Sequence, residues 1–205
     1  GQPCQPQDRG FLEHVCDVFT HPDAIAAAKA RIDFILKTFE GRDVIGSWEL
    51  CAEMTWMITE REEIWGLDRW DDRMMANVRE KMVPWVEEMA SYIKARHPAP
   101  VGNGQVFTGN ALEFHSEPDH FRNVLNEVYD TPSLDFVMIN WYLSGDLDRC
   151  RSWLRTCQEH FEGKQIVVEQ YAPWPPNRTV PYTEEIAPFN PSKAHEWIAA
   201  CGEYG

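Results

Sequence analysis

The chain has 205 residues, of which 43% are hydrophobic and 12% aromatic. This composition excludes a disordered chain and suffices for one globular domain with a sizeable core. The 33 Asp and Glu exceed the 19 Lys and Arg by 14 negative charges, so nucleic acids and membrane surfaces are not expected as partners. No run of about 18 apolar residues is present, which excludes a transmembrane helix. The chain begins without Met or a signal segment, so we expect it to be processed, trimmed or a fragment.

Amphipathic helical segments alternate along the chain with short β-branched strands. The spacing of apolar residues predicts a helix over residues 22–39, which Gly41 ends, and a strand over residues 44–50. The further expected elements are a helix over 68–95 that Pro84 bends or restarts, a strand over 100–107, a helix over 118–128, a strand over 134–143, a helix over 146–161 ended by Gly163, a strand over 165–171 and a helix over 192–201.

This alternation predicts an α/β fold with a parallel sheet covered by helices on both faces. The chain has no internal repeat and no linker, so we expect a single domain over residues 1–205. Two architectures fit about four strand–helix units. One is a partial (β/α)8 TIM barrel, since a complete barrel needs about 250 residues. The other is a compact, four-stranded, doubly wound sheet.

The six cysteines, at positions 4, 16, 51, 150, 157 and 201, form no CxxC pair, so zinc-ribbon spacing is absent. A disulfide between Cys4 and Cys16 in an exported protein and ordinary thiols are both open. The histidines show no HExxH arrangement and there is no Gly-rich phosphate loop. Neither a metal nor a cofactor is therefore expected.

Two carboxylates stand at the C-terminal ends of predicted strands, where parallel α/β folds build their active sites. Glu53 follows the first strand and Glu169 lies in the last, three strand–helix units later. Facing carboxyl groups at these positions would suit glycoside hydrolysis. Solvated or ion-paired glutamates are the alternative. Glu169 is the stronger candidate, because the apolar residues before it predict a buried strand. A carboxylate in such a strand is costly unless it is paired or has a function.

Five segments resemble, in chain order, parts of the glycoside hydrolase clan A barrels, and are closest to the family 5 endo-β-mannanases. They are RIDFILKTFEGRDVIGSWELCAE for the helix and fourth strand, PWVEEMASYIKARHPAPVGNG for the next helix and fifth strand, NEVYDTPSLDFVMINWYL for the sixth strand, EGKQIVVEQYAPW for the seventh, and KAHEWIAACGEYG for the helix before the eighth. The resemblance runs from near residue 20 to the end of the chain and implies a partial barrel spanning strands four to seven.

The resemblance also implies roles for individual residues in a retaining mechanism. Glu53 would be the general acid/base, Glu169 the nucleophile, and Tyr142 the residue that orients the nucleophile through a hydrogen bond. Asn140 stands where the family has His, and Ala52 stands where it has an Asn that contacts the substrate. The loss of that contact is expected to reduce transition-state stabilisation by several kcal/mol.

Two tryptophans complete the predicted binding site. Trp174 follows Glu169 and Trp56 follows Glu53, on loops where a sugar-stacking platform is expected, because pyranose C–H faces pack on aromatic rings. Packing within the loops is the alternative for both side chains.

The sequence therefore predicts a retaining glycoside hydrolase acting on a β-linked polysaccharide or oligosaccharide such as mannan or glucan. A non-catalytic carbohydrate-binding relative, or an inactive fragment of such a barrel, is the alternative. Because the resemblance leaves out strands one to three and eight, self-association or pairing with the missing strands is an expected interaction. Polysaccharide substrates lie outside cells, so an extracellular or cell-envelope location is expected.

Overall fold

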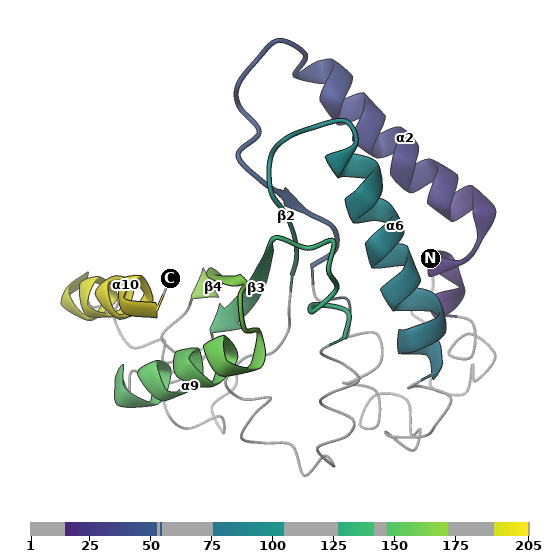
Figure 1. The fold of residues 1–205 in the computed structure, drawn as a ribbon. Coiled ribbons are helices and arrows are strands. Elements are labelled where there is room, and N and C mark those ends of the chain that lie inside the picture. The colour runs from purple at the N-terminus through teal and green to yellow at the C-terminus, as the bar shows by residue number, and fades with distance from the viewer. Residues whose placement is uncertain are drawn as a thin grey trace, which may run out of the picture. The chain divides into compact units, whose positions relative to one another are not determined.

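The computed structural model describes residues 15–52, 54, 76–104, 127–141, 147–171 and 191–204 (Figure 1). Their elements, in chain order, are the 3-10 helix η1 (Val15–Phe19), α2 (Pro22–Thr38), β1 (Trp48–Glu49), the π-helical turn η2 (Val78–Met82), α6 (Val83–Lys94), β2 (Val101–Asn103), β3 (Phe136–Trp141), α9 (Leu147–His160), β4 (Gln165–Tyr171) and α10 (Pro191–Tyr204). Helices and strands alternate among these elements as predicted, except between β2 and β3, where the described residues contain no helix. Of the predicted helix over 118–128, residues 118–126 lie outside the described residues. Residues 127 and 128 form a turn with residue 129.

The fold is α/β, with a four-stranded sheet in the order β1-β2-β3-β4. The pairs β1–β2 and β3–β4 are both parallel. This order follows the chain without the reversal that a doubly wound sheet has at its switch point. The chain divides into two compact units. The first comprises Gly1–Asn103 with Glu117–Asp135, and the second comprises Gly104–Ser116 with Phe136–Gly205.

The first unit has its core between α6 and the strands β1 and β2. The buried face of α6 consists of Val86, Met89, Ala90 and Ile93. Trp48 of β1 is buried beside His97, whose Nδ1 accepts a hydrogen bond from the indole Nε1–H at 3.2 Å. This hydrogen bond satisfies the one polar group of an otherwise apolar side chain.

Pro84 lies where a π-helical turn meets a regular α-helix, and the chain stays helical through residues 76–94 without a restart. The π-helical turn η2 runs directly into α6, and Pro84 stands in the first turn of α6. Because proline has no N–H to donate to the preceding turn, it interrupts the regular hydrogen bonds of a helix, and the π-helical turn η2 lies directly before it. Residues 68–75 of this predicted helix lie outside the described residues.

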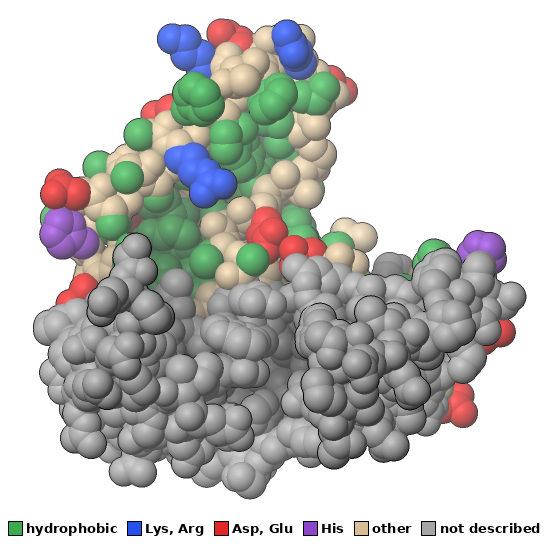
Figure 2. Space-filling view, turned by 180° about the vertical axis from the view of Figure 1, so that it is seen from behind, with side chains coloured by type: hydrophobic (Ala, Val, Ile, Leu, Met, Phe, Trp, Pro, Cys, Tyr) green, Lys and Arg blue, Asp and Glu red, His purple; other side chains and the backbone are tan. Residues whose placement is uncertain are grey.

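The first predicted strand is much shorter than expected. Residues 42–47 form no regular structure, and only Trp48 and Glu49 pair with β2, through Trp48↔Val101 and Glu49↔Gly102. Val44 is 61% exposed, and residues 42–47 pair with no strand in the part of the chain that the structure describes. Hydrophobic side chains reach the surface of this unit over a wide area (Figure 2).

The second unit contains the longer strand pair. Phe136, Val137 and Ile139 of β3 are buried, as is Ile166 of β4. Helix α9 contributes Leu154 and Cys157 to this core, and Phe161 follows it. Gly163 has a φ of +83°, a conformation that glycine adopts without strain, and the chain turns there from α9 into β4 as predicted.

Candidate functional site

Glu169 lies at a break in the ladder between β3 and β4. Ile139 pairs with Val168, but the next residue of β3, Asn140, pairs with Gln170. Strand β4 therefore contains one residue more than β3 at this point, and Glu169 is that extra residue. Such a β-bulge is rare in a parallel pair, and bulges are common next to active sites, where they change the direction of a side chain.

The carboxyl group of Glu169 is partly buried and incompletely bonded. The side chain is of intermediate exposure, its Oε2 is buried, and that atom has no hydrogen-bond partner. Ile166 is buried, as predicted for the strand that carries Glu169, whereas Val167 and Val168 are only half-buried. A buried carboxylate oxygen without a partner destabilises the fold. It is therefore the kind of atom that a hydrogen-bond donor of a ligand would satisfy.

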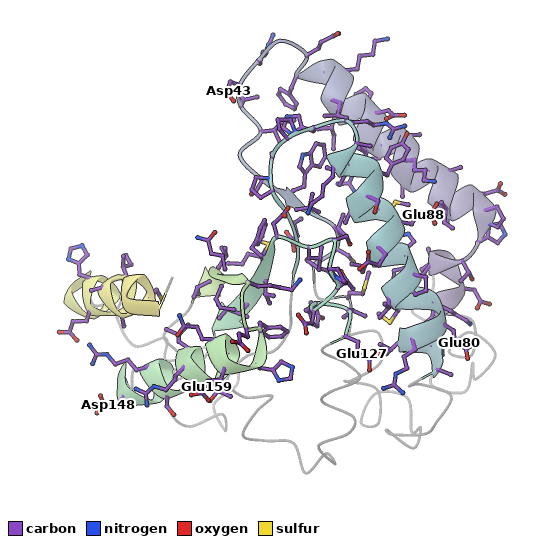
Figure 3. All side chains as sticks on the ribbon, viewed as in Figure 1. Asp43, Glu80, Glu88, Glu127, Asp148 and Glu159 are labelled. Carbon is purple, nitrogen blue, oxygen red and sulfur yellow. The ribbon has the colours of Figure 1, made fainter. Side chains whose placement is uncertain are left out.

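Several other carboxylates of the described residues are exposed. Figure 3 labels several of them on helix surfaces and in loops, and those that are exposed are Asp43, Glu80, Glu88, Asp148 and Glu159. Side chains of this kind are solvated and need no functional explanation. Glu169 stands apart from them by its bulge and its buried oxygen.

Only two of the predicted site residues fall within the described part of the chain. The backbone of Asn140 lies on β3, next to the bulge, so the register brings Asn140 and Glu169 onto neighbouring strands. The remaining predicted residues, Glu53, Trp56, Tyr142 and Trp174, lie outside the described residues. Ala52 is exposed in a turn after β1.

Asn103 is a candidate that the sequence analysis missed. It is the last residue of β2 and is 0% exposed. Its Nδ2 donates a hydrogen bond to the carbonyl oxygen of Val128 at 3.2 Å, while its Oδ1 is buried and has no partner. Among the described residues, Asn103 and Glu169 carry the buried side-chain oxygens that lack partners. The predicted strand runs on to residue 107, so nothing in the sequence indicates that Asn103 ends the strand.

Two cysteines of the described chain are poor nucleophiles. Burial raises the pKa of the Cys157 thiol to about 12. Burial, and then the negative charge of Glu49, raise the pKa of Cys51. Since the thiolate is the reactive form, both side chains remain neutral thiols near pH 7. Cys16 is buried, and Cys4 lies outside the described residues, so their pairing stays open.

No family model matches the sequence, and no match was found among the curated proteins or the solved structures. In the described ranges, no three His, Cys, Asp or Glu side chains are grouped so as to hold a metal ion. The helices of those ranges include none with the length and apolarity needed to cross a membrane.

Proposed function

We propose that this chain belongs to a retaining glycoside hydrolase that cleaves a neutral, β-linked polysaccharide or oligosaccharide, and that Glu169 is its nucleophile. The observation that carries the proposal is the bulge at Glu169, with a buried carboxylate oxygen that has no partner. An attacking carboxylate needs one oxygen that the protein does not engage, and a bulge changes the direction of the side chain that it carries.

The reaction would follow the double displacement of retaining glycosidases. One oxygen of Glu169 attacks the anomeric carbon while the bond to the leaving oxygen breaks, and Glu53 gives its proton to that oxygen. Glu53 then takes a proton from water, whose oxygen attacks the anomeric carbon and releases Glu169. The sugar leaves with the β-configuration that it had in the substrate.

The architecture in this proposal is a partial (β/α)8 barrel. Its support is the strand order, which follows the chain, and the parallel pairing within β1–β2 and within β3–β4. Consecutive strands of a barrel have this order. The proposal places the protein outside the cell or in the cell envelope, where polysaccharides are found, and the missing strands or a second copy would complete the sheet.

A non-catalytic carbohydrate-binding protein is the second candidate. Ala52 favours it, because the residue next to the proposed acid/base has no side-chain amide that could contact the substrate. Binding of manno- or cello-oligosaccharides without hydrolysis of an aryl β-glycoside would support this candidate over the enzyme.

The decisive experiment compares wild-type protein with Glu169→Ala on aryl β-mannosides and β-glucosides. We expect the substitution to lower kcat/KM by on the order of 10⁴-fold or more, because it removes the attacking atom. Added azide should restore turnover in this variant by forming an α-glycosyl azide. The matched control is Glu162→Ala, which removes an exposed carboxylate from the same unit and should leave the rate unchanged.

Stereochemistry provides an independent readout. Proton NMR of the first product of the wild-type protein should show the β-anomer. Wild-type activity in Glu169→Ala, or the α-anomer as first product, would remove Glu169 as the nucleophile of a retaining enzyme.

A further inference from the structure

The amide of Asn103 has one defined orientation. Its Nδ2 donates to the carbonyl oxygen of Val128 at 3.2 Å and lies 3.8 Å from the sulfur of Met54. Exchanging the oxygen and nitrogen of the amide would place two acceptors, Oδ1 and a carbonyl oxygen, against each other. The bond to Val128 therefore fixes Oδ1 as the atom without a partner.

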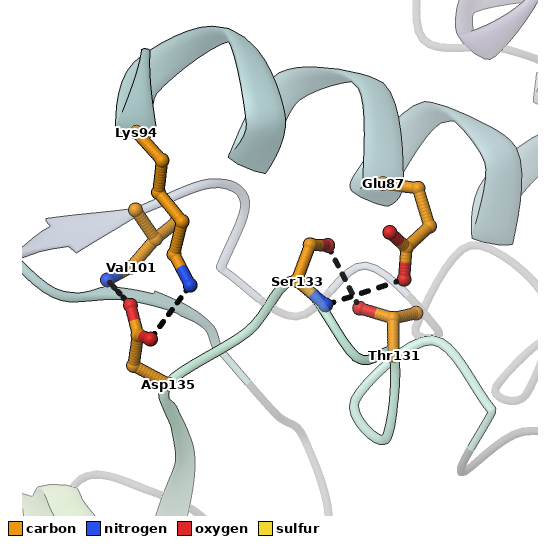
Figure 4. A network of polar contacts seen from close by, with 6 residues as sticks. All are labelled: Glu87, Lys94, Val101, Thr131, Ser133 and Asp135. Carbon is orange, nitrogen blue, oxygen red and sulfur yellow. Dashed lines mark hydrogen bonds and ion pairs between the residues drawn. The ribbon is translucent and has the colours of Figure 1, made fainter. Parts of the chain in front are cut away.

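The backbone that carries Asn103 is fixed at the other end of β2. Asp135 accepts a hydrogen bond from the Val101 N–H through its carboxylate at 2.8 Å, and donates its own N–H to the Val101 carbonyl oxygen at 2.8 Å. Figure 4 shows that the same carboxylate also contacts Lys94 of α6, at 2.6 Å. Val101 and Asn103 are thus both bonded to the segment 127–135, so Asn103 cannot move easily to find another partner.

We infer that Asn103 is a ligand-binding residue whose Oδ1 accepts a hydrogen bond from a hydroxyl group of a bound sugar. A buried acceptor without a donor is costly, and a donor that arrives with a ligand relieves that cost. Asn103 stands at the carboxyl end of a strand in a parallel sheet, which is where such folds bind ligands. A neutral amide oxygen suits an uncharged hydroxyl group. The identity of the ligand as a sugar rests on the proposed function.

The first test observes the wild-type full chain, so it does not depend on a variant that folds. The side-chain amide resonances of Asn103 are assigned in ¹⁵N-labelled protein and followed during titration with mannotetraose and cellotetraose. If Oδ1 accepts a hydrogen bond, these resonances should shift with the same saturation curve as the binding measured by calorimetry.

The second test compares the affinities of Asn103→Ala and Asn77→Ala for the same oligosaccharides. Asn77 lies in the helical turn before η2 and its side chain makes no capping hydrogen bond, so it serves as a matched amide control. We expect Asn103→Ala to bind on the order of tenfold more weakly than wild type, which corresponds to one good hydrogen bond, and Asn77→Ala to bind as wild type.

The outcomes separate this inference from the proposed function. Binding by wild type without any shift of the Asn103 amide, or with equal affinity in a folded Asn103→Ala, overturns the inference and leaves the proposed function standing. If the wild type neither binds these oligosaccharides nor hydrolyses aryl glycosides, both the inference about Asn103 and the proposed function are overturned.

Discussion

Helices α6 and α2 belong to the same unit and both carry clear apolar stripes, but they are packed very differently. Helix α6 buries Val86, Met89, Ala90 and Ile93. Helix α2 is longer, yet Ile32 is its one fully buried residue and Phe34 is 69% exposed. The difference teaches that an apolar stripe predicts a helix and the face it will present, but not how much of that face a neighbour covers.

Polar contacts at the surface join the two helices. Lys29 pairs with Glu88 at 2.6 Å, and the hydroxyl of Tyr92 donates to Asp33 at 2.8 Å. Arg96, two residues after α6, pairs with Asp33 of α2 at 3.5 Å. Exposed ion pairs of this kind contribute little stability, so α2 is held less firmly than α6.

The largest effect that would separate the two helices is expected at Met89. Met89 of α6 is 1% exposed, so Met89→Ala leaves a cavity and should lower the free energy of unfolding by about 2–5 kcal/mol. Ile35→Ala in α2 is the comparison, because Ile35 is only half-buried and should cost less than half as much. Chemical denaturation of both variants measures the difference. Equal losses would show that α2 is as closely packed as α6.

A smaller effect is expected at two aspartates. Asp135 bonds to β2 and α6, and Asp33 of α2 bonds to α6. Asp135→Ala removes the acceptor of the part-buried Val101 N–H as well as the partner of Lys94, and should cost about 1–3 kcal/mol. Asp33→Ala removes only the exposed contacts to Tyr92 and Arg96, and should cost about 0–1 kcal/mol. Thermal unfolding of the two variants compares these losses. A larger loss in Asp33→Ala than in Asp135→Ala would contradict the stronger role given to the bond between Asp135 and β2.

Much of the fold could be predicted because each element carries its own local signal. Strands β3 and β4 lie in runs of apolar and β-branched residues, and Gly41 and Gly163 adopt the positive φ values expected after their helices. The bounds of the first strand were wrong because pairing depends on a partner strand. Beyond Trp48 and Glu49, the sequence around Val44 has no partner within the described residues.

The features of the candidate site depend on tertiary structure to a greater degree. Glu169 could be selected from its position in an apolar strand, but its bulge arises from the register of β4 on β3, which local sequence does not encode. Asn103 was missed for a similar reason. Its importance comes from a bond to Val128, 25 residues later, and from a buried oxygen, and neither is visible in the residues around it.

The smallest effect is expected at Phe34, and it tests the open face of α2 most directly. Phe34 is 69% exposed, so Phe34→Ala loses little buried area, and alanine has the higher helix propensity. The free energy of unfolding should change by no more than about 0.5 kcal/mol. Ile32→Ala, two residues earlier on the buried side of the same helix, should cost about 2 kcal/mol or more. Denaturation of the two variants compares the two sides of one helix at nearly the same point along its axis. A loss at Phe34 as large as that at Ile32 would mean that the ring is covered in solution, and the contrast between α2 and α6 would then be wrong.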